Sequence, residues 1–217
     1  MINLLQPDSS YYVVDETTGS KPQSVTKRAF DITVSLLVAL LILSWFIPLI
    51  GLLIRLESRG PVLFVQLRSG RNGRPFPCLK FRTMKYQKNA SFKQATHNDV
   101  RVTRLGKILR KTNLDEMPQF LNVLVGHMSV VGPRPHALQH DAQFFHLIQD
   151  FPKRYATKPG ITGLAQARGL RGETGLQEMT HRVKLDLWYI RNQSFLLDIK
   201  IFYWTIEKMI KGDKKAY

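Results

Sequence analysis

Apolar residues fill the chain from Ile32 to Ile54 without a single formal charge. As a helix, these residues, about 23 in number, extend roughly 34 Å, which is long enough to cross the core of a bilayer. The segment begins too late and is too long for a signal peptide, and no small-residue cleavage site follows it. The pattern predicts a membrane helix over residues 27–57, between a polar tail, residues 1–26, and a globular region, residues 58–217.

The charges that flank this segment do not select an orientation. Lys27 and Arg28 precede it and Arg55 and Arg59 follow it, so the positive-inside rule favours neither end. Both ends on the cytoplasmic side would explain this symmetry.

A proline interrupts the segment. Pro48 has no amide hydrogen and its ring clashes with the Ser44 carbonyl, while the Ser44 hydroxyl can help to satisfy the freed backbone. We therefore predict a helix break at Ser44 and Pro48, and a helix that enters and leaves on the same face of the membrane. A spanning helix with a tolerated proline explains these residues equally well, and a buried helix of a soluble protein is a lesser alternative.

A small β-hairpin is predicted after the helix. Val62–Gln66 and Phe76–Phe81 are β-prone, and Ser69–Gly73 between them carries turn residues. If the chain stays extended past the second strand, Lys80 and Arg82 project from the same face and direct two positive charges at one place.

Two helices are predicted around a pair of acidic residues. Val102–Lys111 has apolar residues on one side and basic residues largely on the other. A second helix, Pro118–Leu124, begins with a proline that suits its first turn, which puts Asp115 and Glu116 at or just before a positive helix N-terminus. The pair either caps this helix, with Asn113 and Glu116 as a capping box, or carries chemistry. The residues alone support both hypotheses.

Charge favours chemistry on an anionic substrate. The 217 residues include 32 Lys and Arg against 16 Asp and Glu, a net charge of +16, so the partners should be anionic: nucleic acid, anionic lipid or nucleotide. Between Ser58 and Leu114 there are fourteen Lys or Arg and one acidic residue, Asp99. Such a field depresses carboxylate pKa values and attracts anions, and phosphates fit this description best.

Two turns rich in glycine and proline are further candidates for phosphate contacts. In Gly132–Pro135, two prolines fix the backbone around Arg134, whose guanidinium suits bidentate contact with a phosphate. In Lys158–Gly163, the glycines permit close approach of backbone amides to an anion. Either turn is also explained as an ordinary connecting turn without a functional role.

The histidines and the cysteine do not indicate a metal site. The six histidines include His136 and His140 at helical spacing and His146 nearby, without a cysteine cluster or a His-Glu-x-x-His pattern. We interpret them as surface or core residues and assign them no metal. Cys78 is the only cysteine, so no intrachain disulfide forms.

The C-terminal segment predicts an amphipathic helix that lies in the membrane interface or packs on the core. Its apolar stripe consists of Ile199, Phe202, Tyr203, Ile206, Met209 and Ile210.

Four motifs in this order resemble the bacterial sugar transferase family, the monotopic polyprenyl-phosphate phosphoglycosyl transferases. They are Lys80–Met84, Asp115–Gln119, Gly126–Pro135 and Pro159–Gly163. The resemblance extends from about Lys27 to the C-terminus. It implies a mostly α-helical α+β fold with a proline-broken re-entrant helix, interfacial amphipathic helices and a small β-hairpin. It also implies a catalytic domain, residues 58–217, at the cytosolic face of the bacterial inner membrane.

The resemblance further implies an activity. Members transfer a sugar 1-phosphate from a nucleotide diphosphate sugar to a polyprenyl phosphate, with Mg²⁺ and through a covalent intermediate. Carried onto this chain, Asp115 is the nucleophile and Glu116 its acidic partner, and the two carboxylates are the expected metal ligands. Phosphoryl transfer asks a protein mainly for positioning and charge stabilisation. The residues expected to bind substrate and its phosphates are Lys80, Arg82, Arg110, Arg134, Thr162, Gln166 and Arg171.

The C-terminal part resembles members that use UDP-glucose and undecaprenyl phosphate. Leu164 stands where many members have tryptophan, and Leu170 stands where some have arginine, which weakens the uridine contacts expected near Gln166 and Arg171. Larger members carry preceding membrane helices, so this chain looks like a minimal form. Beside its substrates we expect membrane lipids as partners and no nucleic acid, and leave open a homodimer and contacts with downstream glycosyltransferases. A membrane-anchored nucleic-acid binder and a membrane scaffold are the competing functions.

Overall fold

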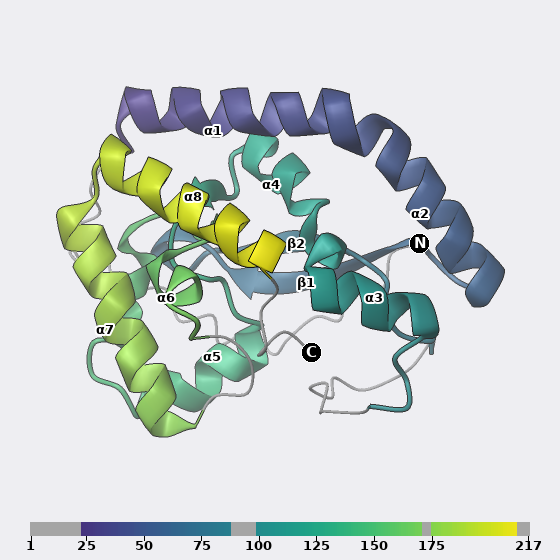
Figure 1. Ribbon diagram of the computed structural model, residues 1–217. Helices are drawn as coiled ribbons and strands as arrows, with labels where there is room; N and C mark the ends of the chain where they lie inside the picture. The colour runs from purple at the N-terminus through teal and green to yellow at the C-terminus, as the bar shows by residue number, and fades with distance from the viewer. Residues whose placement is uncertain (1–22, 88–98, 171–174, 212–217) are drawn as a thin grey trace.

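One long bent helix lies across a compact body of helices and short strands (Figure 1). The computed structural model describes residues 23–87, 99–170 and 175–211. Its α-helices are α1 Val25–Val38, α2 Ser44–Glu57, α3 Arg104–Thr112, α4 Gln119–Val125, α5 Leu138–Phe145, α6 Leu164–Ala167, α7 Leu176–Asn192 and α8 Phe195–Lys211. The strands are β1 Leu63–Ser69, β2 Pro75–Phe81, β3 Ser129–Val131 and β4 Gly160–Thr162. The prediction of a mostly helical α+β fold with a small hairpin is therefore confirmed.

The long helix does bend, but the bend lies about one turn before Ser44 and Pro48, where the sequence predicted it. A π-helical turn, Ala39–Leu43, joins α1 to α2, and the helix changes direction there (Figure 1). Pro48 lies inside α2. The Ser44 hydroxyl donates to the Leu40 carbonyl at 2.7 Å, inside this turn, and not near the group that the proline leaves without a donor. A π-turn is an ordinary cause of a helix kink, and here it accommodates the backbone just before the residue that Pro48 would strike.

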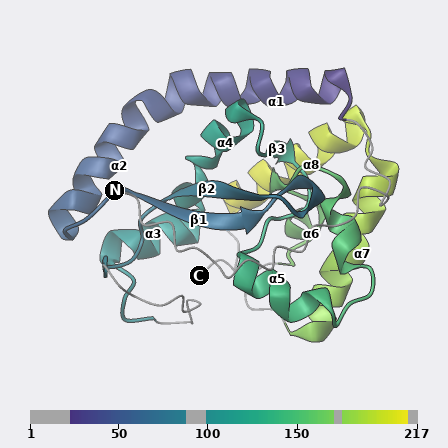
Figure 2. The same cartoon turned by 180° about the vertical axis from the view of Figure 1, so that it is seen from behind.

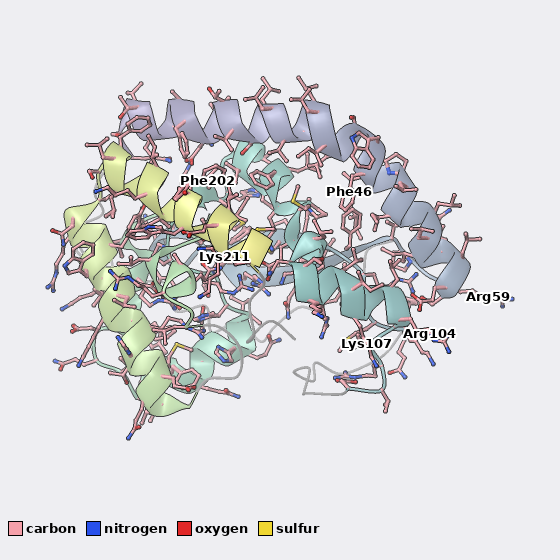
Figure 3. The ribbon with its side chains drawn as sticks, in the orientation of Figure 1. Phe46, Arg59, Arg104, Lys107, Phe202 and Lys211 are labelled. Carbon is pink, nitrogen blue, oxygen red and sulfur yellow. The ribbon has the colours of Figure 1, made fainter. Side chains whose placement is uncertain are left out.

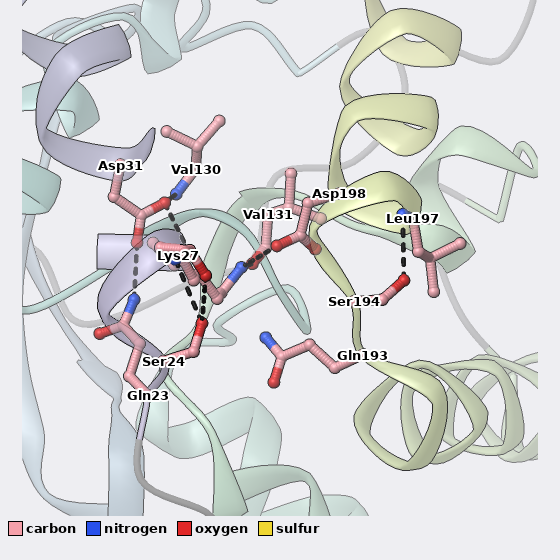
Figure 4. Close-up of polar contacts among 12 residues, drawn as sticks. Gln23, Ser24, Lys27, Asp31, Val130, Val131, Gln193, Ser194, Leu197 and Asp198 are labelled. Carbon is pink, nitrogen blue, oxygen red and sulfur yellow. Dashed lines mark hydrogen bonds and ion pairs between the residues drawn. The ribbon is translucent and has the colours of Figure 1, made fainter. Parts of the chain in front are cut away.

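Buried charges fasten the start of α1 to the body (Figure 4). The Lys27 ammonium donates to Asp198 at 2.8 Å and to the Val131 carbonyl at 2.9 Å, and both side chains are almost fully buried. Asp31 accepts from the Val130 amide and the Ser129 hydroxyl, each at 2.9 Å. Lys27 therefore forms a buried structural ion pair with Asp198, and it is not an exposed charge at the end of the apolar segment.

The end of α2 is fastened to the same body. The Glu57 carboxylate accepts from the Arg104 amide at the start of α3, at 2.7 Å. The Arg82 guanidinium donates to the Ser58 and Arg59 carbonyls, each at 2.7 Å. Arg59, Arg104 and Lys107 project from this end of the molecule (Figure 3). Both ends of the 33-residue helix Val25–Glu57 therefore belong to one folded unit.

The outer side of this helix is apolar and exposed. Within the described residues it is the one helix long and apolar enough to cross a membrane, with a mean hydropathy of 2.8. Only 22% of its most apolar stretch is buried, so most of that surface faces away from the body. The exposed side chains include Leu37, Leu40, Leu41, Trp45, Leu52 and Leu56. A soluble core helix would bury this surface, so the buried-helix alternative is wrong.

The hairpin lies on the side of the body turned away in Figure 1 and is seen in front in Figure 2. β1 and β2 pair antiparallel, with Leu63 opposite Phe81 and Ser69 opposite Pro75. Asn72 adopts a left-handed φ of 56° in the turn, a conformation that asparagine tolerates better than most residues. The hairpin and its turn are as predicted, one or two residues longer.

The main core lies beneath α1, where α4, the hairpin, β3 and α8 meet. Its fully buried residues include Val123, Val130, Val131 and Ile201. On α8, Ile201 and Asp198 face the body, whereas four of the six stripe residues, Ile199, Tyr203, Ile206 and Met209, are exposed. Phe202, labelled in Figure 3, instead packs against Phe30 of α1. The alternative that this stripe packs on the core is thus wrong for the exposed four; Ile210 is outside the described side chains.

Candidate active site

The acidic pair lies in a buried turn between two helices. Asn113 ends α3 in a left-handed conformation, φ 58°, and a 3-10 turn, Leu114–Glu116, leads to Pro118 and α4. The Asn113 side chain makes no capping hydrogen bond. Asp115 and Glu116 are each exposed by less than a tenth. The capping-box hypothesis is wrong, because the Glu116 carboxylate is bound elsewhere.

Three hydrogen bonds hold the Glu116 carboxylate. Arg134 donates to both oxygens, at 3.0 Å to Oε2 and 2.6 Å to Oε1, and Lys80 donates to Oε1 at 2.6 Å. Burial alone would raise the pKa of Glu116, but the charges of Arg134 and Lys80 and their hydrogen bonds outweigh it and hold that pKa well below its ordinary value. Glu116 is therefore a fixed anion that orients two cations.

Asp115 has the opposite environment. Within the described residues its carboxylate makes no hydrogen bond or ion pair, although it is buried beside the same cations. Burial raises the pKa of Asp115 above 3.8, and the adjacent Glu116 charge adds to this, while Lys80, Arg110 and Arg134 oppose it. Two neighbouring carboxylates thus differ sharply: one is locked in place and the other is free to react.

Arg154 holds Arg134 in position through the Arg134 backbone carbonyl. The Arg154 guanidinium donates to the Arg134 carbonyl at 2.8 Å, and its Nε donates to Asp186 at 2.8 Å. Arg154 and Asp186 are both almost fully buried. Sequence reasoning missed this pair, because nothing in the local sequence around either residue connects η4, the 3-10 helix Phe151–Ala156, with α7.

The two turns predicted from glycine and proline lie side by side. β3 and β4 pair in parallel, the Gly132 amide donates to the Thr162 carbonyl at 2.8 Å and the Gly160 amide donates to the Pro133 carbonyl at 2.9 Å. A Cβ on Gly160 would lie 2.1 Å from the Gly132 nitrogen. The glycines therefore let two backbones approach each other, and the Gly160 amide is engaged by the Pro133 carbonyl and does not face an anion.

A sequence model of the family described as "Bacterial sugar transferase" matches residues 22–212, most of the chain. The protein belongs to the bacterial sugar transferase family.

Similar sugar transferases come from several bacteria. A relative from Klebsiella pneumoniae, named UDP-glucose:undecaprenyl-phosphate glucose-1-phosphate transferase, is 50% identical over 197 residues, 89% of this chain and 42% of the relative. One of the same name from Escherichia coli K12 is 49% identical over 195 residues, again 89% and 42%. The Exopolysaccharide production protein PSS of Rhizobium leguminosarum is 47% identical over 188 residues, 84% of this chain and 94% of that protein. The chain thus spans about two fifths of the first two relatives.

The structure of this sugar transferase brings together some of the predicted site residues. Lys80 and Arg134 bind Glu116, and the Arg110 charge acts on Asp115, while its Nε donates to Thr83 at 2.8 Å. Arg82 does not join them, because it binds the end of α2, so the prediction that it and Lys80 converge on one place is wrong.

The remaining predicted residues are engaged elsewhere or lie outside the description. The Thr162 hydroxyl is hydrogen-bonded to that of Thr205 on α8, at 2.6 Å. Gln166 is buried and its amide donates to the Ile161 carbonyl at 3.1 Å. Arg171 lies outside the described residues.

The available carboxylate oxygens can accept a divalent cation. Two donors saturate Oε1 of Glu116, but Oε2 takes only one, and both Asp115 oxygens are free of hydrogen bonds to the described residues. Mg²⁺ is commonly bound by one or two carboxylates together with substrate phosphates and water, and this donor set fits that pattern. A second group, His136, His140 and Asp141, has ligand atoms within 4.8 Å of one another. We assign it no metal, because the Arg154 and Arg182 guanidiniums both contact His136.

Proposed function

We propose that this sugar transferase moves a sugar 1-phosphate, glucose 1-phosphate, from a UDP-sugar to undecaprenyl phosphate and releases UMP. The observation that carries the proposal is the unequal acidic pair: Asp115 is unbonded among cations, whereas Glu116 is locked by Arg134 and Lys80. The names of the relatives supply the substrates. The reaction would be the first membrane step of exopolysaccharide or other glycoconjugate synthesis, in keeping with the Rhizobium relative.

In the first displacement, an Asp115 carboxylate oxygen attacks the phosphorus that carries the sugar. The bond from that phosphorus to the bridging oxygen breaks, and UMP leaves with the electron pair. The product is a sugar phosphate joined to Asp115 as an acyl phosphate. The free carboxylate suits this role, because no hydrogen bond to a described residue must be broken before it attacks.

In the second displacement, an oxygen of undecaprenyl phosphate attacks the same phosphorus. The bond between Asp115 and phosphorus breaks, which restores the carboxylate and forms the polyprenyl diphosphate sugar. A phosphate oxyanion needs no base to become a nucleophile, so this step asks the site for charge stabilisation and not for a general base. One bimolecular encounter becomes two easier displacements.

The cations of the site stabilise charge on the transferred phosphate. Lys80 and Arg134 are held by Glu116 with N–H groups to spare, and the charges of Arg110 and Asp115 act on each other, so three positive charges would face a phosphate bound at Asp115. Mg²⁺, held by Asp115 and Glu116 Oε2, would offset the negative charge of the diphosphate when bound.

The acidic limb of the pH profile should report Asp115. Because the carboxylate attacks only when ionised and burial raises its pKa, kcat/KM should fall as the pH drops through a value above the ordinary pKa of an aspartate. Lys80→Met removes a charge that lowers this pKa and should move the limb to higher pH. The exposed Lys107 of α3 gives the control, and a limb that Lys80→Met and Lys107→Met leave equally unmoved would contradict the assignment.

We further propose that α1 and α2 form a re-entrant membrane helix and that the catalytic body lies on the cytosolic face of the inner membrane. The support is that one body binds both ends of the helix while its outer side remains apolar. The exposed stripe of α8 would lie in the same interface.

Cysteine labelling tests this topology. In a Cys78→Ala chain, Val25→Cys and Arg59→Cys place thiols at the two exposed ends of the helix, and Leu41→Cys places one at its exposed middle. A membrane-impermeant maleimide should label both ends only in inverted vesicles and should leave position 41 unreacted. Labelling of the two ends from opposite sides would establish a spanning helix.

A UMP-release assay with a panel of UDP-sugars tests the substrate. We expect UDP-glucose to be turned over with the highest kcat/KM, in the presence of undecaprenyl phosphate. A relative from Aeromonas hydrophila, 40% identical, is named for N-acetylgalactosamine transfer, so UDP-N-acetylgalactosamine is the informative competitor. Release of UMP from none of the panel would refute the proposed function.

A further inference from the structure

Arg182 on α7 is a buried arginine with no carboxylate at ion-pair distance among the described residues, although the charges of Asp186 and Glu178 act on it from farther away. Arg182 is only 5% exposed, yet it forms no ion pair with any described residue. Its Nε has no hydrogen-bond partner within the described part of the chain. Its one hydrogen bond to the described residues joins Nη1 and His136 Nε2 at 3.5 Å, which is the outer limit of a hydrogen bond. Buried charges in proteins are normally paired, so this arrangement calls for a missing anion.

The neighbouring Arg154 shows what a structural arginine looks like in the same cluster. It is equally buried, but it donates to Asp186 at 2.8 Å and to the Arg134 carbonyl at 2.8 Å. Arg154 thus binds one Asp186 oxygen, whereas Arg182 makes no hydrogen bond to this carboxylate. The two arginines face opposite sides of one imidazole, His136, and only Arg154 has a carboxylate.

His136 does not neutralise Arg182. Burial, followed by the Arg154 charge, lowers the pKa of His136 to about 3, so the ring is uncharged at neutral pH. Its Nδ1 lies 3.1 Å from Asp141, which keeps that carboxylate on the far side of the ring. The imidazole thus orients the guanidinium and supplies no negative charge to it.

The charge that faces Arg182 most strongly is that of Arg134. After burial, Arg134 and then Arg154 are the main causes that lower the pKa of Arg182 to about 10. Arg134 is the residue that grips Glu116, and an arginine keeps N–H groups beyond the two that bind a carboxylate. Arg182 also contacts His136, which follows Arg134 by two residues, so the two guanidiniums belong to one cluster. Such a cluster suits an anion with several oxygens.

We propose that Arg182 completes a phosphate-binding site with Arg134, which takes the terminal oxygens of a phosphate monoester. Two monoesters fit this chemistry: the nucleoside monophosphate that leaves and the lipid phosphate that arrives. The proposal rests on the proposed function and adds a binding residue to it. It also explains why a charge without a partner is kept in the core, because a ligand compensates for it only in the bound state.

Binding measurements on the full chain in detergent test the proposal, with Arg182→Gln as the variant and Lys184→Gln as its control. Lys184 is exposed on the same helix and touches none of these groups. The probes are UMP, uridine and farnesyl phosphate, each measured separately by calorimetry. We expect Arg182→Gln to weaken the binding of UMP, of farnesyl phosphate or of both roughly tenfold or more. Its affinity for uridine, and all affinities of the control variant, should be unchanged. If only the affinity for UMP falls, the site binds the leaving nucleotide. If only the affinity for farnesyl phosphate falls, it binds the lipid phosphate, and if both fall, the two ligands share the site.

Stability separates this role from a structural one. Replacement of an uncompensated buried charge by a neutral amide should leave the unfolding temperature of the ligand-free protein unchanged or higher, whereas removal of a structural ion pair would lower it. Unchanged affinity for both phosphates overturns the proposal, whatever the stability. If Arg182→Gln does not fold, the proposal is tested with Arg182→Lys, which keeps the charge and should retain part of the affinity; full affinity overturns it. None of these readouts needs turnover, so failure of the transferase activity itself would be seen separately with Asp115 variants.

Discussion

Asp115→Asn should abolish sugar phosphate transfer without harm to the fold. The amide has the same shape but cannot attack phosphorus, so UMP release should fall by on the order of a thousandfold or more. Because the carboxylate makes no hydrogen bond to a described residue and burial raises its pKa, loss of its charge should not destabilise the protein. Steady-state UMP release and thermal unfolding measure the two effects.

Glu116→Gln is the matched variant. It removes the counter-charge of Arg134 and Lys80, so it should lower both activity and the unfolding temperature. The contrast is the informative result: one carboxylate is dispensable for folding and the other is not. If Asp115→Asn turned over UDP-sugar at the wild-type rate, the assignment of the nucleophile would be wrong.

Lys27→Met should be among the most destabilising single substitutions. Among the described residues it leaves the buried Asp198 carboxylate with only the Tyr189 hydroxyl as a donor, at 2.6 Å, and it removes the ammonium that binds the Val131 carbonyl. Breaking a buried ion pair by removal of one partner costs about 3–5 kcal/mol. The free energy of unfolding, measured by denaturant in detergent, should fall by this amount.

The double variant Lys27→Met with Asp198→Leu provides the control. With both charges gone, no carboxylate is left uncompensated, and a large part of the lost stability should return. Lys200→Met, an exposed lysine on α8, should have little effect. A Lys27→Met variant as stable as wild type would show that this ion pair does not hold α1 on the body.

Local patterns predicted the elements of this fold well. The apolar run, the turn at Asn72 and the proline before α4 are properties of neighbouring residues, and each lies where the sequence placed it. The acidic pair was also recognised, because two carboxylates in a basic stretch stand out without knowledge of the fold. The bend of the long helix was predicted, but its place was one turn off, since a π-turn can absorb the strain upstream of a proline.

The roles of individual cations could not be predicted in the same way. Lys80 and Arg82 are two residues apart, yet one binds Glu116 and the other binds carbonyls at the end of α2. Arg154 supports Arg134 only because η4 packs against α7, a contact between distant segments. Lys27 resembles a membrane-flanking charge until β3 and α8 close around it. Such partners are set by tertiary packing and leave no trace in local sequence.

The central claim is that Asp115 carries the sugar phosphate during the reaction. The most direct test is to incubate the protein with UDP-glucose in the absence of undecaprenyl phosphate, quench it, and map the peptide around Asp115 by mass spectrometry. The account predicts a hexose phosphate adduct on Asp115, one equivalent of UMP released in a burst, and loss of the adduct when lipid phosphate is added. A burst of UMP with no adduct on Asp115, or an adduct that persists in Asp115→Asn, would contradict it.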